Sequence, residues 1–358
     1  KNMNANADKE IREFVENEFY LLHKRNPNNV ELSVLYSKIL ELHILLSSSL
    51  ENGCKHILTL LSRAEELVEK YPDHFEIINN FSSILVNSIQ KLSQEKKIDE
   101  MINLLGTLKE YYLIFDNLDL LVQLANVYHT IIRTYGSLKK YEKQISFLKE
   151  FKEWIANDQF EIEIHIFYCK ALFSTIKTLE SLNKIGLSEY YLDELGEIAD
   201  NFHATNNIQE SYAKSLSLSI KWRLEYNANS DIIIKKFKQL YALQKEFSEN
   251  DEILLAYAKA IRFMLINIDV LDLPELISTL LDNLKTLDAE YADKPVIQNE
   301  IALSYSGIIL SNTLIWDDVI KDEILKEFNH LMERNPENEK LFDIYQNITP
   351  YLKKGKFS

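Results

Sequence analysis

The sequence is poor in the residues that interrupt helices and close tight turns, with only 7 glycines and 6 prolines among 358 residues. A β-rich or α/β chain of this length needs many more turn glycines. The scarcity therefore argues against those folds and favours long helices joined by short turns. Apolar residues make up 46% of the chain and charged residues 27%, so a substantial core can form and disorder is not expected.

Motifs for phosphate and metal chemistry are also missing. The glycines never fall within six residues of each other, which excludes a P-loop and a dinucleotide fingerprint. There is no cysteine pair at zinc spacing and no H-E-x-x-H motif. One Glu-x-x-His pair occurs, Glu327 with His330, but a di-iron bundle needs a second such pair and two more carboxylates. We expect no metal, no cofactor and no enzymatic activity.

Other absences bear on location and partners. The two cysteines, Cys54 and Cys169, fall in different units of the repeat described below, so we expect no disulfide and a reducing cytoplasm. The polar start is unlike a signal peptide, and the longest uncharged run, residues 301–316, is too short for a membrane span. The net charge of −15 disfavours nucleic acid and anionic membranes as partners.

What the chain does contain is a repeat. A five-residue phrase begins with a large anchor residue, continues with a small residue and recurs eight times at spacings of 45, 43, 44, 44, 45, 44 and 44 residues. The anchors are Tyr36, Phe81, Leu124, Tyr168, Tyr212, Tyr257, Ile301 and Tyr345. Such constant spacing is the signature of a repeat architecture, in which each unit buries apolar surface only against its neighbours.

A turn signal rich in Asn, Asp and Pro lies about ten residues before each anchor, as expected for residues that cap and start helices. Each unit therefore contains an A helix, which begins at the turn and carries the anchor, and a B helix, which ends at the turn. The A helices are expected at 29–48, 75–94, 118–135, 160–182, 208–226, 251–268, 295–313 and 337–352, and the B helices at 7–24, 54–71, 98–114, 141–156, 187–202, 231–247, 274–291 and 317–333.

The small residue after each anchor is explained by close helix packing, because two helices approach closely only where side chains are small. These residues are Ser37, Ser82, Ala125, Cys169, Ala213, Ala258 and Ala302, with Gln346 in the last unit. Cys169 is therefore interpreted as a buried structural residue, and Gln346 as a residue of an end unit that faces water. Helix 7–24 is expected to cap the N-terminal end and helix 337–352 the C-terminal end.

The helical hairpin, the Tyr-Ala phrase and the Asn-Pro or Pro-Asp turn resemble the tetratricopeptide repeat (TPR) over nearly the whole chain. The unit is longer than the 34 residues of that family and lacks its Trp-Leu-Gly phrase. It is more similar to long-helix relatives found in bacterial regulatory and sensor proteins. The resemblance implies a right-handed superhelix whose A helices line a concave face. We expect one all-α solenoid domain over residues 1–358, made of about eight helix-turn-helix repeats of roughly 44 residues.

The A helices carry a row of cations on one face. The row, called the basic stripe below, occupies the second position and the ninth position after the anchor, which are seven residues apart and share a helix face. It consists of Arg133, Lys170, Lys177, Lys214, Lys221 and Lys259, and Trp222 lies beside it. Acidic residues in the first turn of the A helices, such as Glu31, Glu76 and Glu252, are favourable near helix N-termini.

The basic stripe allows three interpretations. Its lysines can be a solvated face paired with neighbouring acids. They can instead form a positive strip on the concave face that attracts an acidic peptide or a C-terminal carboxylate. Binding of nucleic acid, with Trp222 as a stacking residue, is the weakest of the three, because other aromatic residues are scarce along the stripe.

The expected function is a scaffold that binds a protein or peptide on its concave face, since long solenoids offer the extended surface such contacts need. The alternative is a regulatory or sensor arm of a larger bacterial signalling or defence protein whose catalytic domain lies outside this chain. The absence of catalytic motifs and the start at Lys1 fit both hypotheses.

Overall fold

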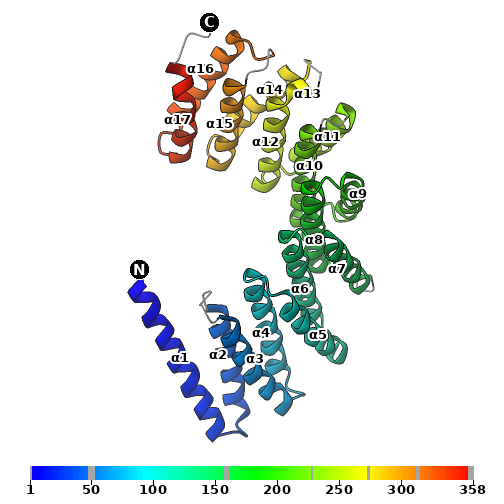
Figure 1. Cartoon of the computed structure of the whole chain (residues 1–358), viewed down its shortest axis with the longest axis vertical. Coiled ribbons are helices and arrows are strands. Elements are labelled where there is room, and N and C mark those ends of the chain that lie inside the picture. The colour runs from blue at the N-terminus through cyan, green and yellow to red at the C-terminus, as the bar shows by residue number, and fades with distance from the viewer. Residues whose placement is uncertain are drawn as a thin grey trace. The chain divides into compact units, whose positions relative to one another are not determined.

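The computed structural model describes residues 2–46, 53–156, 161–226, 229–271, 275–311 and 315–353, with side chains except at 2–13, 46, 53–55 and 351–353. All regular elements in these ranges are helices (Figure 1). The A helices are α2 (Val30–Leu46), α4 (Phe75–Gln94), α6 (Leu118–Ser137), α8 (Ile162–Ser181), α10 (Asn206–Glu225), α12 (Asp251–Ile266), α15 (Pro295–Leu310) and α17 (Glu339–Lys353). The B helices are α1 (Asn2–Arg25), α3 (Gly53–Lys70), α5 (Ile98–Phe115), α7 (Tyr141–Ile155), α9 (Ile185–Asn201), α11 (Ser230–Glu246), α14 (Glu275–Glu290) and α16 (Asp318–Arg334).

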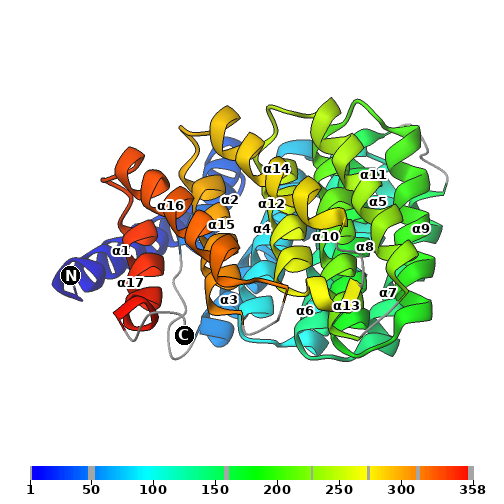
Figure 2. The same ribbon diagram turned by 90° about the horizontal axis from the view of Figure 1, so that it is seen from above.

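The chain folds as an all-α helical repeat solenoid, as expected, and its contacts divide it into two compact units, Lys1–Thr175 and Ile176–Ser358. Within the first unit α2 packs on α4 and α4 on α6, while α3 lies against α2 and α4 and α5 against α4 and α6. The second unit repeats the scheme: α10, α12, α15 and α17 pack in sequence, and α11 contacts α10 and α12 (Figure 2). The B helices α3, α5, α11 and α14 thus each lie against the A helices of two successive repeats.

The anchors and their small neighbours build the core, as the repeat predicts. Tyr36, Phe81, Leu124, Tyr168, Tyr257 and Ile301 are buried, while Tyr212 and Tyr345 are half-buried. Every small residue after an anchor is buried, including Cys169, and Gln346 of the last repeat is exposed. Between neighbouring A helices the amide of Asn80 donates to the hydroxyl of Ser37 at 2.8 Å. Small side chains therefore allow the direct contact between A helices.

The turns before the A helices are closed by the residue types that the sequence indicates. The side chains of Asn117 and Asn250 accept hydrogen bonds from backbone N–H groups at the start of α6 and α12. Pro295 occupies the first turn of α15, where a missing N–H costs nothing. The side chain of Cys54 lies outside the described residues.

The turns that follow three A helices use non-glycine residues in the left-handed region. Lys96, Lys139 and Asn183, after α4, α6 and α8, have φ of 59°, 56° and 55°. In each case the next residue's N–H bonds back to a carbonyl five positions earlier, as from Lys140 to Tyr135 at 3.0 Å. This is the hydrogen bond of a Schellman motif, whose left-handed position is usually glycine. The scarcity of glycine therefore leaves these turns strained.

Several helix boundaries differ from those expected from the sequence, most of all at α1, which was expected at 7–24 and spans Asn2–Arg25. The expected A helix 251–268 ends at Ile266, and a separate turn of helix, α13 (Ile268–Leu271), follows it. Ile268 and Leu271 are both buried, so one extra helical turn places two apolar residues against the core. The expected helix 295–313 ends at Leu310, because Ser311 adopts an extended backbone.

Candidate functional site

The first part of the basic stripe lies on α6 and α8 in the first unit. Arg133 is exposed and Lys170 is half-buried, and the Lys170 ammonium lies 5.4 Å from the centre of the Phe167 ring. The imidazole of His129, one turn before Arg133 on α6, lies 6.3 Å from the same ring, measured between centroids. These four residues, called the His129 cluster below, bring two cations, an imidazole and an aromatic ring together.

Electrostatics connect the members of the His129 cluster. Burial, followed by the positive charges of Arg133 and Lys170, lowers the pKa of His129 to about 4. The imidazole is therefore neutral at pH 7. Among the described residues, no carboxylate lies within ion-pair distance of Arg133 or Lys170. In the described part of the chain the cluster therefore holds two cations without a carboxylate counter-ion.

In the second unit two lysines of the basic stripe are paired. The Lys214 ammonium lies 3.0 Å from a carboxylate oxygen of Glu252 and 3.9 Å from one of Glu210. The Lys221 ammonium lies 3.6 Å from Glu225 and stands 5.1 Å from the centre of the Trp222 ring. These lysines match the first interpretation of the stripe, a face paired with neighbouring acids.

The other stripe residues of the second unit are not paired with acids in the described part of the chain. Lys177 is exposed and Lys259 half-buried, and no ion pair to either occurs in the described part of the chain. Trp222 is half-buried and stacks on Tyr226 with ring centroids 5.8 Å apart. Its indole N–H is buried without a hydrogen-bond partner. The structure therefore separates the stripe residues into paired lysines and cations without an acidic neighbour.

A regular ion pair between successive A helices went unnoticed in the sequence. Lys38 pairs with Glu76, and Lys214 pairs with Glu252, from the second position after one anchor to the first turn of the next A helix. The first-turn acids thus have a second role beside their favourable place at helix N-termini. The signal was present in the sequence as a cation and an acid 38 residues apart in the same repeat register.

A buried group of charges also escaped the sequence analysis. Glu189 on α9 pairs with both Arg223 on α10 and Lys236 on α11, the latter at 3.0 Å. Arg223 and Lys236 are both buried, and desolvation, followed by the charge of Arg223, lowers the pKa of Lys236 to about 8. Nearby, Ser188 donates to the buried Glu180 at 2.6 Å, and burial raises the pKa of Glu180. These charges join the helices internally and do not open onto a described pocket.

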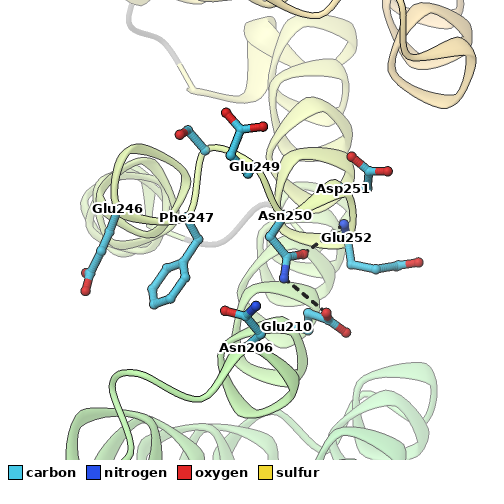
Figure 3. Close-up of a pocket in the computed structure, with 9 residues that line it drawn as sticks. Asn206, Glu210, Glu246, Phe247, Glu249, Asn250, Asp251 and Glu252 are labelled. Atoms are coloured by element: carbon cyan, nitrogen blue, oxygen red, sulfur yellow. Dashed lines mark hydrogen bonds between the residues drawn. The ribbon is translucent and has the colours of Figure 1, made fainter.

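An open pocket of about 480 Å³ lies where the turn between α11 and α12 meets the start of α10 (Figure 3). Its walls carry the carboxylates of Glu210, Glu246, Glu249, Asp251 and Glu252. Asn250 donates to Glu210 at 3.1 Å and caps α12, while lysines pair with three of the acids. The described residues contain no group of acids, histidines or cysteines arranged to hold a metal.

Glu327, His330 and Trp316 take part in contacts or packing within the fold. Glu327 pairs with Lys285 at 3.5 Å, and His330 lies 3.6 Å from Glu333 on the exposed side of α16. Trp316, two residues before the start of α16, is buried. No described helix combines the length and the hydropathy of a membrane-spanning segment.

Comparison with protein-family models, with curated proteins and with solved structures gave no significant match. The resemblance to the tetratricopeptide repeat and the superhelix it implies therefore stay predictions, and the helical solenoid is what the structure establishes.

Proposed function

We propose that this chain is a protein- or peptide-binding module, and that the His129 cluster on its A-helix face binds an acidic segment of the partner. The observation that carries the proposal is the pair Arg133 and Lys170, which lie near one another and near His129 without an acidic neighbour in the described structure. In a chain of net charge −15, these two cations stand beside an imidazole and an aromatic ring and pair with no acid among the described residues. Local positive potential attracts acidic ligands even when the whole molecule is negative.

The chemistry of the cluster favours a carboxylate. Arg133 presents planar guanidinium donors that match a carboxylate in a bidentate geometry, and Lys170 adds a second positive charge. The Phe167 ring offers an apolar contact beside these charges. A bound carboxylate would also oppose the two charges that lower the pKa of His129. In acidic solution, near the lowered pKa of His129, binding of an acidic segment is therefore coupled to proton uptake by this imidazole.

The stripe residues of the second unit are further candidates for contact with a partner, each within that unit. Lys177 follows Lys170 by two turns of α8 and is exposed, so both lie on one side of the same helix. Lys259 and Trp222 are further candidates on α12 and α10, and the indole N–H of Trp222 lacks a partner. Lys214 and Lys221 would first have to exchange their present acidic partners. We therefore place the strongest contribution to binding on Arg133 and Lys170.

The test uses an array of peptides graded from acidic to basic, probed with the whole chain. Wild type is expected to retain acidic peptides, and retention is expected to weaken as salt increases. The double variant Arg133→Glu and Lys170→Glu should lose affinity by roughly tenfold or more, because two attractive contacts become repulsive.

The matched control is Lys143→Glu with Lys149→Glu, which makes the same change of charge on the exposed side of the B helix α7. This control should bind like wild type apart from a small effect of net charge. Equal losses in both double variants would mean that only total charge matters. That result, or the absence of any preference for acidic peptides, would overturn the proposal.

A further inference from the structure

The first A helix, α2, exposes apolar residues at positions that the other A helices cover. The positions lie one residue before and six residues after the anchor, and in α2 they hold Leu35 and Leu42, which are 46% and 53% exposed. One residue before the anchor, α4 has Asn80 and α12 has Ala256, which are 7% and 3% exposed. No residue at either position is exposed in the other described A helices.

The first B helix, α1, shows the same deficiency. Val15 and Leu22 are 38% and 41% exposed. The equivalent residues of α3, 45 positions later, are Leu60 and Leu67, and both are fully buried. The helix α3 packs on α2, the A helix of the preceding repeat. No described A helix precedes α1, so the equivalent surface of α1 is exposed.

The outer surface of α1 is also more apolar than that of α3. Phe14 and Leu21 are exposed there. The equivalent positions of α3 hold the exposed polar residues Thr59 and Glu66. Terminal repeats of solenoids ordinarily present a polar outer face to water. The N-terminal end of this chain therefore has the composition of a covered surface.

The repeat register shows what kind of element would cover this face. In the second unit the position six residues after the anchor of α15 is Gly307, and a side chain there would meet Ile266 of the preceding A helix, α12. In the first unit Asn80 bonds to Ser37 of the preceding A helix, α2. Residues at both positions therefore contact the A helix of the preceding repeat, which packs alongside.

Charge adds a second requirement. The first-turn acids Glu76 and Glu252 each pair with a lysine of the preceding A helix. Glu31 is the corresponding acid of α2, and it has no ion-pair partner among the described residues. A helix in the place of a preceding A helix would pair with Glu31 if it carried a cation in the register of Lys38 or Lys214.

We propose that Val15, Leu22, Leu35 and Leu42, together with Glu31, form a docking face for an amphipathic α-helix of a partner protein. The partner helix lies along α2, places apolar and small residues on the four side chains and presents a lysine or arginine to Glu31. The far end of this chain does not meet these requirements, because Gln346 and Asn347 on α17 are exposed and uncharged. End-to-end stacking of two copies would therefore leave Glu31 without a cation.

The test uses a labelled helical peptide as the probe. A peptide with the sequence of α10 has a lysine in the required register, Lys214, and a covalent staple on its outer side would hold it helical in isolation. Its binding to the whole chain is followed by fluorescence anisotropy. We expect saturable binding and a loss of at least roughly tenfold in affinity for the variant Leu35→Glu with Leu42→Glu, since two apolar contacts are replaced by charges.

The matched control is Leu113→Glu with Ile114→Glu, which changes two exposed apolar residues at the end of α5. It should bind the peptide like wild type, and a peptide with Lys214→Glu should bind more weakly to every form of the chain. Circular dichroism checks that the variants keep their helices, as substitutions at exposed positions should. The variant Arg133→Glu with Lys170→Glu should also bind normally, which separates this face from the His129 cluster.

Two results would overturn the proposal. The first is no binding, or equal binding by the Leu35→Glu with Leu42→Glu variant and by the control. The second is a dimer of the wild-type chain in sedimentation experiments that disappears in this variant, because the face would then be an interface between two copies.

Discussion

Replacing Lys139 by glycine should make the protein more stable, because Lys139 occupies a left-handed backbone position at the end of α6. Its φ is 56° and its side chain is exposed, so the substitution removes strain without removing a contact. A left-handed conformation costs an L-residue roughly 1–2 kcal/mol. Glycine also lowers the free energy of unfolding by about 0.4–1 kcal/mol, because it gives the unfolded chain greater conformational freedom. The expected net gain in the free energy of unfolding is about 0.5–1 kcal/mol.

The matched control is Lys143→Gly, only four residues away in the first turn of α7. Its side chain is also exposed and the same charge is lost, but its backbone is helical. Glycine there should cost about 1 kcal/mol. Urea unfolding followed by circular dichroism gives the overall change, and native-state hydrogen exchange shows whether it is confined to α6 and α7. If both variants lose stability alike, the assignment of strain to Lys139 is wrong.

Two further predictions concern buried ionisable groups. Because the pKa of His129 is lowered to about 4, the unfolded chain binds its proton first as the pH falls, so stability should drop between pH 6.5 and 4. A His129→Gln variant should lack about 1–2 kcal/mol of that drop at pH 5, as measured by urea unfolding. The pKa of Lys236 is lowered to about 8, so wild-type stability should gain from deprotonation of this lysine between pH 8 and 10.5. The variant Lys236→Met should be more stable than wild type at pH 7 by about 1–3 kcal/mol, and this difference should shrink as the pH rises. If the variant is less stable at every pH, the ion pair between Lys236 and Glu189 outweighs the cost of desolvating the lysine.

The architecture could be predicted from the sequence because the repeat combines two independent signals. The anchor positions fix which helix face is buried, and the Asn, Asp and Pro turns fix where helices begin. Both signals are local, so they can be identified in the sequence without knowledge of distant contacts. The short helix α13 was missed because its residues, Ile268 and Leu271, follow directly on an apolar helix and no turn signal separates them.

The candidate site could be predicted only in part. The spacing placed Arg133 and Lys170 correctly on A helices, but it could not show that His129 and Phe167 lie beside them. Nor did spacing reveal which stripe lysines have partners, because that depends on the side-chain directions of the next helix. Lys214 meets Glu252 since the following A helix offers an acid in its first turn, whereas the helix after α6 provides none within reach of Arg133.

Within a unit, each hairpin packs against its immediate neighbours, and this has a mechanical consequence. A tension applied to one end of the chain would load the outermost hairpin first, because no distant segment is tied across it within its unit. Detaching one hairpin of about 44 residues releases a length on the order of 150 Å of extended chain. Partner helices docked at an end would therefore act as a clamp that resists fraying under load.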